Sequence, residues 1–315
     1  MKLNKRICGW LAFLALPVAQ CQADFDGCDN FNDNSIDGAK WAAPVFSSGA
    51  ALLTETSQRL QFTTTATPTA QDAYALGWWP NTGSYTQDWE LKVDANMGMP
   101  VFPVASPQPI LGLDLVVTPA GTFGPNNYFV IEFGQDIWRW VHCEMATNGG
   151  TMVLAQTNSS ATNVAIRIVF DSTSKVLSAF ADDNTAGCGY SATPVASAVV
   201  PATWGMTTNQ FSAGLLGIGH NIAVAPTNNV FFDNFKAAAG SLPGPRITQT
   251  GNHVAITWPT NSPACQMEST LTLAPPVCWG QATNAVATLG TDFIVTNVAS
   301  SQSKFFRLSR DYGCP

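Results

Sequence analysis

Aromatic, imidazole and carboxylate side chains gather on one face of a β-hairpin that the sequence predicts. A strand at 128–133 is followed by a second at 137–144, and side chains alternate between the two faces of each strand. Pairing through a three-residue loop at 134–136 places five of them on one face, namely Trp138, Trp140, Tyr128, His142 and Glu132. Sugars lay their apolar C–H faces on aromatic rings and hydrogen-bond to such polar groups through their hydroxyls. These five residues are therefore the candidate site for a carbohydrate.

The same hairpin admits a second register. A two-residue loop at Gln135–Asp136 would shift the pairing by one residue and exchange the two faces of the strand. Trp138 and Trp140 would then lie beside Phe129 and Phe133 in the core. The sequence is compatible with a binding face and with a buried aromatic cluster, and the direction of the two indoles decides between them.

The predicted hairpin does not bring together carboxylates that could catalyse hydrolysis. In the predicted pairing Glu144 lies opposite Asn126, six residues along the strand from Glu132, or about 20 Å at ~3.3 Å per residue. Two hydrolytic carboxylates need a separation of about 5 to 9.5 Å. The sequence also contains no His-Glu-x-x-His zinc motif and no Gly-x-Ser-x-Gly nucleophile turn. His142 and Tyr128 could act as the base and the acid of a lyase. Apart from this pair, we expect no catalytic residue.

Short β-rich runs supply the scaffold for this face. The chain has 315 residues, of which 46% are hydrophobic and only 11% charged. Between residues 24 and 239 its apolar runs alternate with clusters of Gly, Asn, Pro and Asp, which is typical of an antiparallel sandwich. The predicted strands lie at 59–62, 89–93, 128–133, 137–144, 164–170, 176–181, 215–218 and 230–235. We predict an all-β chain whose main part, 24–239, is an antiparallel β-sandwich.

The two ends of the chain differ from this sandwich. Residues 1–23 have the pattern of a secretory signal peptide, with three basic residues before a short apolar run. That run is too short to span a membrane, and no later segment is long enough. A breaker-rich linker at 240–245 precedes a small β-sandwich-like module at 246–315. We therefore expect a secreted protein that is extracellular, periplasmic or on the cell surface.

Charge limits the partners of the exported chain. Without the three basic residues of the leader it carries 11 basic and 21 acidic side chains, a net charge of −10. Nucleic acids and anionic membrane surfaces bind clustered Lys and Arg. We expect neither as a partner, whereas the aromatic face predicts a polysaccharide or another glycan.

Six cysteines remain after the leader, and an even number in an exported chain indicates disulfide bonds. Their spacing does not match the close pairs that a zinc site favours. Among the roughly 15 connectivities open to six cysteines, we predict Cys143–Cys188, Cys265–Cys278 and Cys28–Cys314.

Several stretches of the predicted sandwich carry a resemblance to a known family. They are Asp29–Asn34 with Trp41, an early strand at 55–60, a central hairpin at 165–171 and 175–180, and a closing strand at 230–235. Together they resemble the concanavalin-A-like lectin/glucanase superfamily, especially its laminin-G-like jelly rolls. The resemblance implies a jelly-roll β-sandwich that binds glycans on its concave sheet or on the loops at its rim.

The same resemblance implies a structural Ca²⁺ ion. Many relatives hold calcium near the first and last strands of the sandwich, which points here to Asp29 and Asp233. Residues 24–30 are dense in oxygen ligands, which Ca²⁺ prefers. The alternative is that these acids cap turns or protect a sheet edge. Glycosidases of the superfamily carry a Glu-x-Asp-x-(x)-Glu run, and this sequence contains none.

The C-terminal module has its own pattern, formed by 254–259, 266–273, Trp279 and 305–308. It resembles the short immunoglobulin- or fibronectin-III-like modules of exported bacterial proteins, which usually serve attachment or act as spacers. We predict a noncatalytic carbohydrate-binding or surface-associated protein. The alternatives are a polysaccharide-cleaving hydrolase or lyase on the concave face, and a structural adhesion or spacer protein without a ligand site.

Overall fold

The computed structural model describes the greater part of both predicted β regions. The described residues are 26–38, 41–48, 51–64, 72–120, 126–183, 193–207, 210–240, 244–260, 265–273, 279–282, 284–298 and 303–310. The predicted signal peptide at 1–23 and part of the predicted linker at 240–245 lie outside them.

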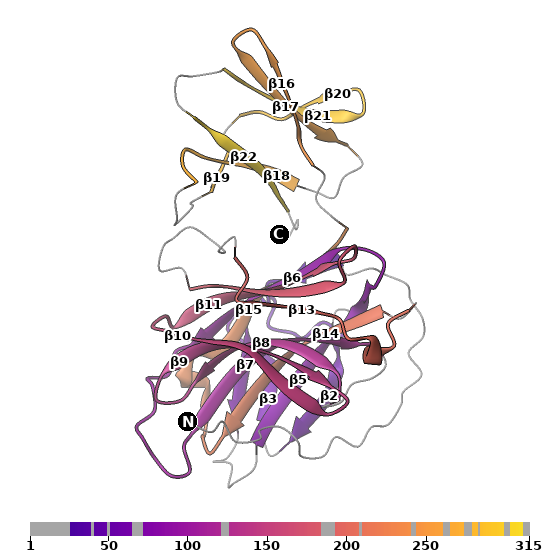
Figure 1. Cartoon of the computed structure of the whole chain (residues 1–315). Coiled ribbons are helices and arrows are strands. Elements are labelled where there is room, and N and C mark those ends of the chain that lie inside the picture. Colours follow the sequence, from indigo (N-terminus) through magenta and orange to yellow (C-terminus); the bar gives the residue numbers. More distant parts are fainter. Residues whose placement is uncertain are drawn as a thin grey trace.

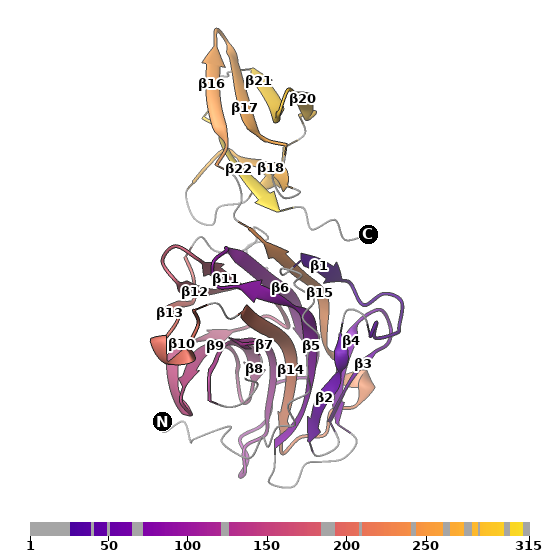
Figure 2. The same cartoon turned by 90° about the vertical axis from the view of Figure 1, so that its right-hand side faces the viewer.

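Two antiparallel sheets lie face to face and form the larger part of the molecule (Figure 1, Figure 2). Sheet A has the order β13-β12-β11-β6-β15-β4-β3, with β1 paired to β15. Its strands are β1 (Asp26–Asp29), β3 (Ala51–Glu55), β4 (Leu60–Thr64), β6 (Trp89–Met97), β11 (Asn163–Asp171), β12 (Val176–Asp182), β13 (Ala196–Val199) and β15 (Val230–Ala239).

Sheet B has the order β10-β9-β8-β7-β14-β5-β2. Its strands are β2 (Ala42–Ser48), β5 (Asp72–Ser84), β7 (Ile110–Pro119), β8 (Tyr128–Gln135), β9 (Arg139–Thr147), β10 (Gly150–Ser159) and β14 (Gln210–His220). The chain crosses between the sheets several times, so many strands lie beside strands that are distant in sequence.

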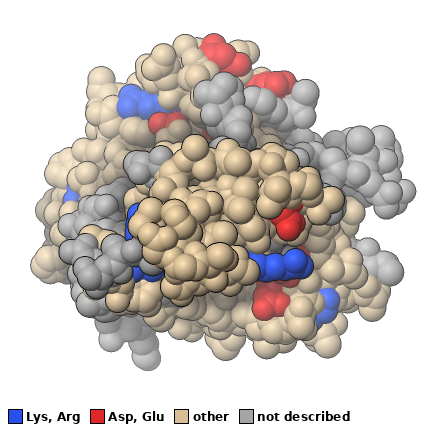
Figure 3. All heavy atoms as spheres, turned by 90° about the horizontal axis from the view of Figure 1, so that it is seen from above, with Lys and Arg blue, Asp and Glu red and all other residues tan. Residues whose placement is uncertain are grey.

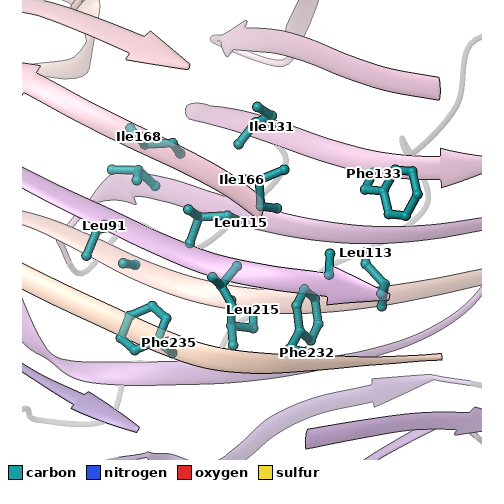
Figure 4. Close-up of a cluster of buried hydrophobic side chains, with 14 of the residues drawn as sticks. Leu91, Leu113, Leu115, Ile131, Phe133, Ile166, Ile168, Leu215, Phe232 and Phe235 are labelled. Carbon is teal, nitrogen blue, oxygen red and sulfur yellow. The ribbon is translucent and has the colours of Figure 1, made fainter. Parts of the chain in front are cut away.

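Alternation of side chains produces the core between the two sheets. Along β6 every second residue from Trp89 to Met97 is buried, and the residues between them face outward. Figure 4 shows how both sheets contribute, with Phe232 from sheet A and Leu113 and Leu215 from sheet B. Removing these apolar surfaces from water is the main favourable contribution to folding.

The two sheets approach each other closely at Gly217 on β14. The fully buried ring of Phe62, on β4 of sheet A, lies against this glycine, and a Cβ atom at Gly217 would overlap the ring. A residue without a Cβ atom is therefore required here for the packing of the two layers.

The C-terminal strands form two smaller sheets, which Figure 1 shows beside the sandwich. Their orders are β16-β17-β21-β20 and β19-β18-β22. The strands are β16 (Arg246–Thr250), β17 (His253–Pro259), β18 (Cys265–Thr270), β19 (Gly280–Gln281), β20 (Ala287–Leu289), β21 (Asp292–Val298) and β22 (Phe305–Arg310). They enclose a separate hydrophobic cluster of Ile256, Trp258, Met267, Val295 and Leu308. The exact boundaries at 239 and 246 stay predictions.

The expected fold class is confirmed, since the chain is all-β and antiparallel, with a sandwich before a small β module. The predicted central hairpin is β11–β12, and the predicted closing strand is the first part of β15. The early strand expected at 55–60 is wrong. Glu55 ends β3 and Leu60 begins β4, and 56–59 form the turn between them, where Thr56 N donates to Arg59 O at 3.0 Å.

The structure corrects one of the predicted disulfides. Cys143 lies on β9 with its side chain in the core, and its thiol is free, so the predicted bond Cys143–Cys188 is absent. Burial raises the pKa of this thiol to about 12. Cys28 is disulfide-bonded. Cys188, Cys278 and Cys314 lie outside the described residues, so the pairs Cys28–Cys314 and Cys265–Cys278 stay predictions.

Charged groups are sparse on the surface seen in Figure 3, where Lys and Arg are scattered among uncharged residues. In the described part of the chain the only helices are two 3-10 turns, η1 (Ala202–Trp204) and η2 (Pro226–Asn228). None of the described helices is long and apolar enough to cross a membrane.

Candidate functional site

The β8–β9 hairpin has a three-residue turn, but the turn lies two residues later than predicted. Asp136 begins it and accepts a hydrogen bond on Oδ1 from Trp138 N at 2.9 Å. Glu132 lies opposite His142, whereas the predicted pairing placed Tyr128 there. Because the register differs by an even number of residues, the predicted faces are preserved. The face of sheet B that points away from sheet A, here called the outer face, carries Tyr128, Glu132, Trp140 and His142.

The two tryptophans occupy different places. Trp138 lies in the turn, with 62% of its surface exposed, and so does not face Glu132 as predicted. Trp140 lies on the outer face, 8% exposed, with its indole against Gly134 on the neighbouring strand. Neither belongs to the core cluster that contains Phe129 and Phe133. The alternative register, with both indoles in the core, is therefore wrong.

A row of polar side chains crosses three adjacent strands of the outer face. Asp114 on β7 lies opposite Glu132 on β8, which in turn lies opposite His142 on β9. Asp114 is 4% exposed, and its buried Oδ1 has no hydrogen-bond partner. Burial raises the pKa of Asp114 well above its usual value, and the negative charges of Glu132 and Glu144 raise it further.

Glu144, two residues beyond His142 on β9, is fixed by two hydrogen bonds. Tyr128 Oη donates to its Oε1 at 2.6 Å, and His142 Nε2 donates to its Oε2 at 3.1 Å. Burial and the Glu144 charge both raise the pKa of Tyr128, so the phenol keeps its proton. Burial lowers the pKa of His142, but the hydrogen bond to Glu144 and the negative charges of Glu132 and Glu144 together outweigh it, so the net pKa is raised.

The large separation expected between Glu132 and Glu144 is wrong. Glu144 lies opposite Val130, so the two glutamates are diagonal neighbours on adjacent strands. Such neighbours are about 7–8 Å apart. The cause is the later turn, which shifts the register and brings Glu144 back toward Glu132.

Glycines make space for this cluster. A Cβ atom at Gly134 would overlap the indole of Trp140, and one at Gly112 would overlap the carboxylate of Glu132. Gly112 and Gly134 lie opposite each other on β7 and β8. Their missing side chains therefore leave a depression in the sheet that the indole and the carboxylate fill.

Sequence reasoning missed Asp114, because the strand that holds it was not predicted. The ten residues of β7 are all buried, and this aspartate is the only charged one among them. An acidic residue inside a continuous apolar run was the available signal, since buried carboxylates are rare without a partner or a role.

The residues predicted to hold Ca²⁺ do not form one site. Asp29 lies opposite Phe235, whose ring is in the core, and its oxygens accept from Phe31 N at 3.0 Å and Trp41 Nε1 at 2.7 Å. Asp233 lies opposite Asp94, on the other face of sheet A. The described residues contain no group of three His, Cys, Asp or Glu that could hold a metal ion. Asp29 instead joins the first strand to Trp41, which agrees with the capping alternative.

Near Asp29, a buried glutamate makes folding sensitive to pH. Burial raises the pKa of Glu55 to about 7, and the charges of Asp33 and Asp29 add to the shift. The protonated form therefore favours folding below the unfolded value of 4.5, and this contribution is lost as pH rises through about 7.

Glu55→Gln is expected to raise the free energy of unfolding by about 2 kcal/mol at pH 8 and to change it little at pH 4. The gain follows from removing a charge that is costly to bury. Urea denaturation at the two pH values measures it. An equal change at both would contradict the role of the charge.

The fold and the site define an antiparallel β-sandwich with an acidic, aromatic cluster on the outer face of one sheet. No protein-family model matches the sequence, and no curated protein sequence matches it. Among solved structures it is similar to lectin I-B4 from Griffonia simplicifolia, at 13% identity and a TM-score of 0.44. That match covers 67% of this chain and 98% of the lectin.

Two further lectin structures show a likeness of the same order. A winged bean acidic lectin complexed with methyl-α-D-galactose has 15% identity and a TM-score of 0.42, over 67% of this chain and 98% of the lectin. The potassium-bound carbohydrate recognition domain of Emp46p has 11% identity and a TM-score of 0.44, over 68% and 96%. These likenesses are too distant to assign a family, a ligand or a metal to this chain.

Proposed function

We propose that this is a secreted protein that binds carbohydrate on the outer face of sheet B. The observation that carries the proposal is the row of Asp114, Glu132 and His142 beside the indole of Trp140. Sugar hydroxyls donate and accept hydrogen bonds, and carboxylates, a phenol and an imidazole offer both kinds of partner here. Trp138, exposed in the turn between β8 and β9, adds a flat apolar surface at the end of the same hairpin.

The charge of the cluster favours a neutral glycan. Asp114, Glu132 and Glu144 lie on neighbouring positions, and His142 is the basic side chain among them. An anionic polysaccharide would meet repulsion from these carboxylates. We therefore assign neutral polysaccharides as the ligand class.

Replacing Trp138 with alanine tests the binding face. The ring is 62% exposed, so we expect an unchanged melting temperature and about tenfold weaker retention, since ~1.4 kcal/mol of lost contact is tenfold. Affinity electrophoresis in gels containing soluble β-glucan, xylan or galactomannan measures the retention.

Trp279→Ala in the C-terminal module is the matched control and should leave retention unchanged. Equal retention of Trp138→Ala and the native protein would remove Trp138 from the site. Failure of the native protein to be retained by any of these glycans would overturn the binding proposal and favour a structural adhesion or spacer protein.

We also propose that the protein is exported and that its C-terminal module attaches it to, or spaces it from, a surface. The basic and apolar residues of 1–23 support export. The separate hydrophobic cluster around Trp258 supports a C-terminal module, 246–315, that packs on its own. We assign to this module attachment to a cell surface or matrix, or spacing from it.

A further inference from the structure

We infer that the cluster on the outer face also hydrolyses glycosidic bonds, with the Asp114–Glu132 pair as proton donor and Glu144 as base. The inference rests on the proposed carbohydrate binding and extends it from retention to cleavage. Three features of the cluster support it, namely a buried unpartnered acid, a fixed carboxylate and the separation between proton donor and base.

The first feature is the proton donor. Asp114 and Glu132 lie directly opposite each other, with Cβ atoms about 4.5–5.5 Å apart. Two carboxyls this close do not both ionise readily, so the pair keeps a proton at a pH where an isolated carboxyl has lost it. Asp114 is buried and its Oδ1 is unpartnered, whereas Glu132 is partly exposed. Glu132 is therefore the member that delivers the proton to a bound sugar.

The second feature is the base. Tyr128 and His142 each donate a hydrogen bond to Glu144, one to each carboxylate oxygen. Each oxygen has a second acceptor position, and the side chain is 15% exposed, so a water molecule can reach it. Tyr128 and His142 are positioning residues, because they hold this carboxylate in one orientation.

The third feature is the separation between acid and base. Glu132 and Glu144 are diagonal neighbours, and the backbone positions of such a pair lie about 7–8 Å apart. The Glu132 carboxylate leans over Gly112, on the side away from Glu144. Carboxyl groups about 6.5–9.5 Å apart leave space for a water molecule and invert the configuration at the anomeric carbon. The geometry therefore assigns an inverting hydrolysis.

The reaction balances with water as the co-reactant. The bond between the anomeric carbon and the glycosidic oxygen breaks while Glu132 transfers its proton to the leaving oxygen. A water oxygen bonds to the anomeric carbon from the opposite side and gives its proton to Glu144. Exchange with solvent then returns a proton to the Asp114–Glu132 pair and removes one from Glu144.

The test compares the native protein with Glu132→Gln and Glu144→Gln on soluble β-glucan, xylan and galactomannan. We expect new reducing ends from at least one of them, and a loss of at least about 100-fold in rate for each variant. Retention in affinity gels is measured on both variants, so that a loss of binding is distinguished from a loss of cleavage. Glu90→Gln, on the far face of sheet A, is the matched control and should keep the full rate.

Four outcomes overturn the inference. Retention by the native protein without release of reducing ends would leave binding and remove cleavage, whereas neither retention nor release would remove both. A product with a new carbon–carbon double bond would show a lyase. A first product with the same anomeric configuration as the substrate, observed by NMR, would exclude Glu144 as a base that acts through water. Melting curves of the variants, with Asp114→Asn as a third, separate lost activity from lost folding.

Discussion

Replacing Gly217 with alanine is expected to lower the free energy of unfolding by about 2–3 kcal/mol. The added methyl group would overlap the ring of Phe62, which is fully buried between the two sheets. The ring has no free space to move into, so either it leaves its preferred rotamer or the sheets separate locally. Urea denaturation measures the loss.

Gly219→Ala is the matched control, because Gly219 lies two residues further along the same strand and on the same face. There the nearest atom to a new Cβ is Ile222 Cγ2 at 3.3 Å, the end of a side chain that can adjust. We expect a change below about 1 kcal/mol. Equal losses at the two positions would contradict the close approach at Gly217.

Asp114→Asn is expected to raise the free energy of unfolding by about 2 kcal/mol at neutral pH, since a buried charge costs several kcal/mol after relaxation. The native carboxyl is 4% exposed, and its Oδ1 is unpartnered. The same variant should lose hydrolysis if Asp114 shares the donor proton. A gain in stability with a loss of activity is the expected signature of a functional site.

The pH dependence of stability separates this gain from a simple packing effect. The pKa of Asp114 is raised above 3.8, so protonation favours the folded state. That contribution is fully present below pH 3.8 and is lost as pH rises through the higher folded value. The native protein should therefore lose stability over this range, and Asp114→Asn should lose less. Parallel pH curves for the two proteins would contradict the assignment.

The faces of the hairpin could be predicted from sequence, but its register could not. Side chains alternate along each strand, and which of them share a face across β8 and β9 depends only on whether the loop has an odd or even number of residues. Gly134 looked like a turn residue, yet it lies inside β8 because the Trp140 indole needs the space. Asp136 forms the turn through its side chain instead. The contact between two strands thus overrode a local preference for a turn.

The central part of the candidate site depended on that register. Tyr128, Glu132 and His142 were found because they alternate on two predicted strands. Asp114 was missed because β7 is buried on both sides and so shows no alternation. The short distance between Glu132 and Glu144 followed from the pairing of the strands, which no single strand encodes.

The predicted calcium site and the predicted Cys143–Cys188 bond failed for a different reason. The sequence does not show to which side of its sheet each of these residues points. Asp29 and Asp233 lie on opposite sides of sheet A, and Cys143 points into the interior. Spacing in the sequence gives no information on such directions across a bulged strand.

The buried thiol of Cys143 can report how often the two sheets of the sandwich separate. Thiolate is the reactive form, and this side chain is both shielded from solvent and held in its protonated state. An alkylating reagent can reach it only when sheets A and B part. The rate at which a maleimide modifies Cys143, followed by mass spectrometry of its peptide, therefore reports how often the two layers open in the folded protein.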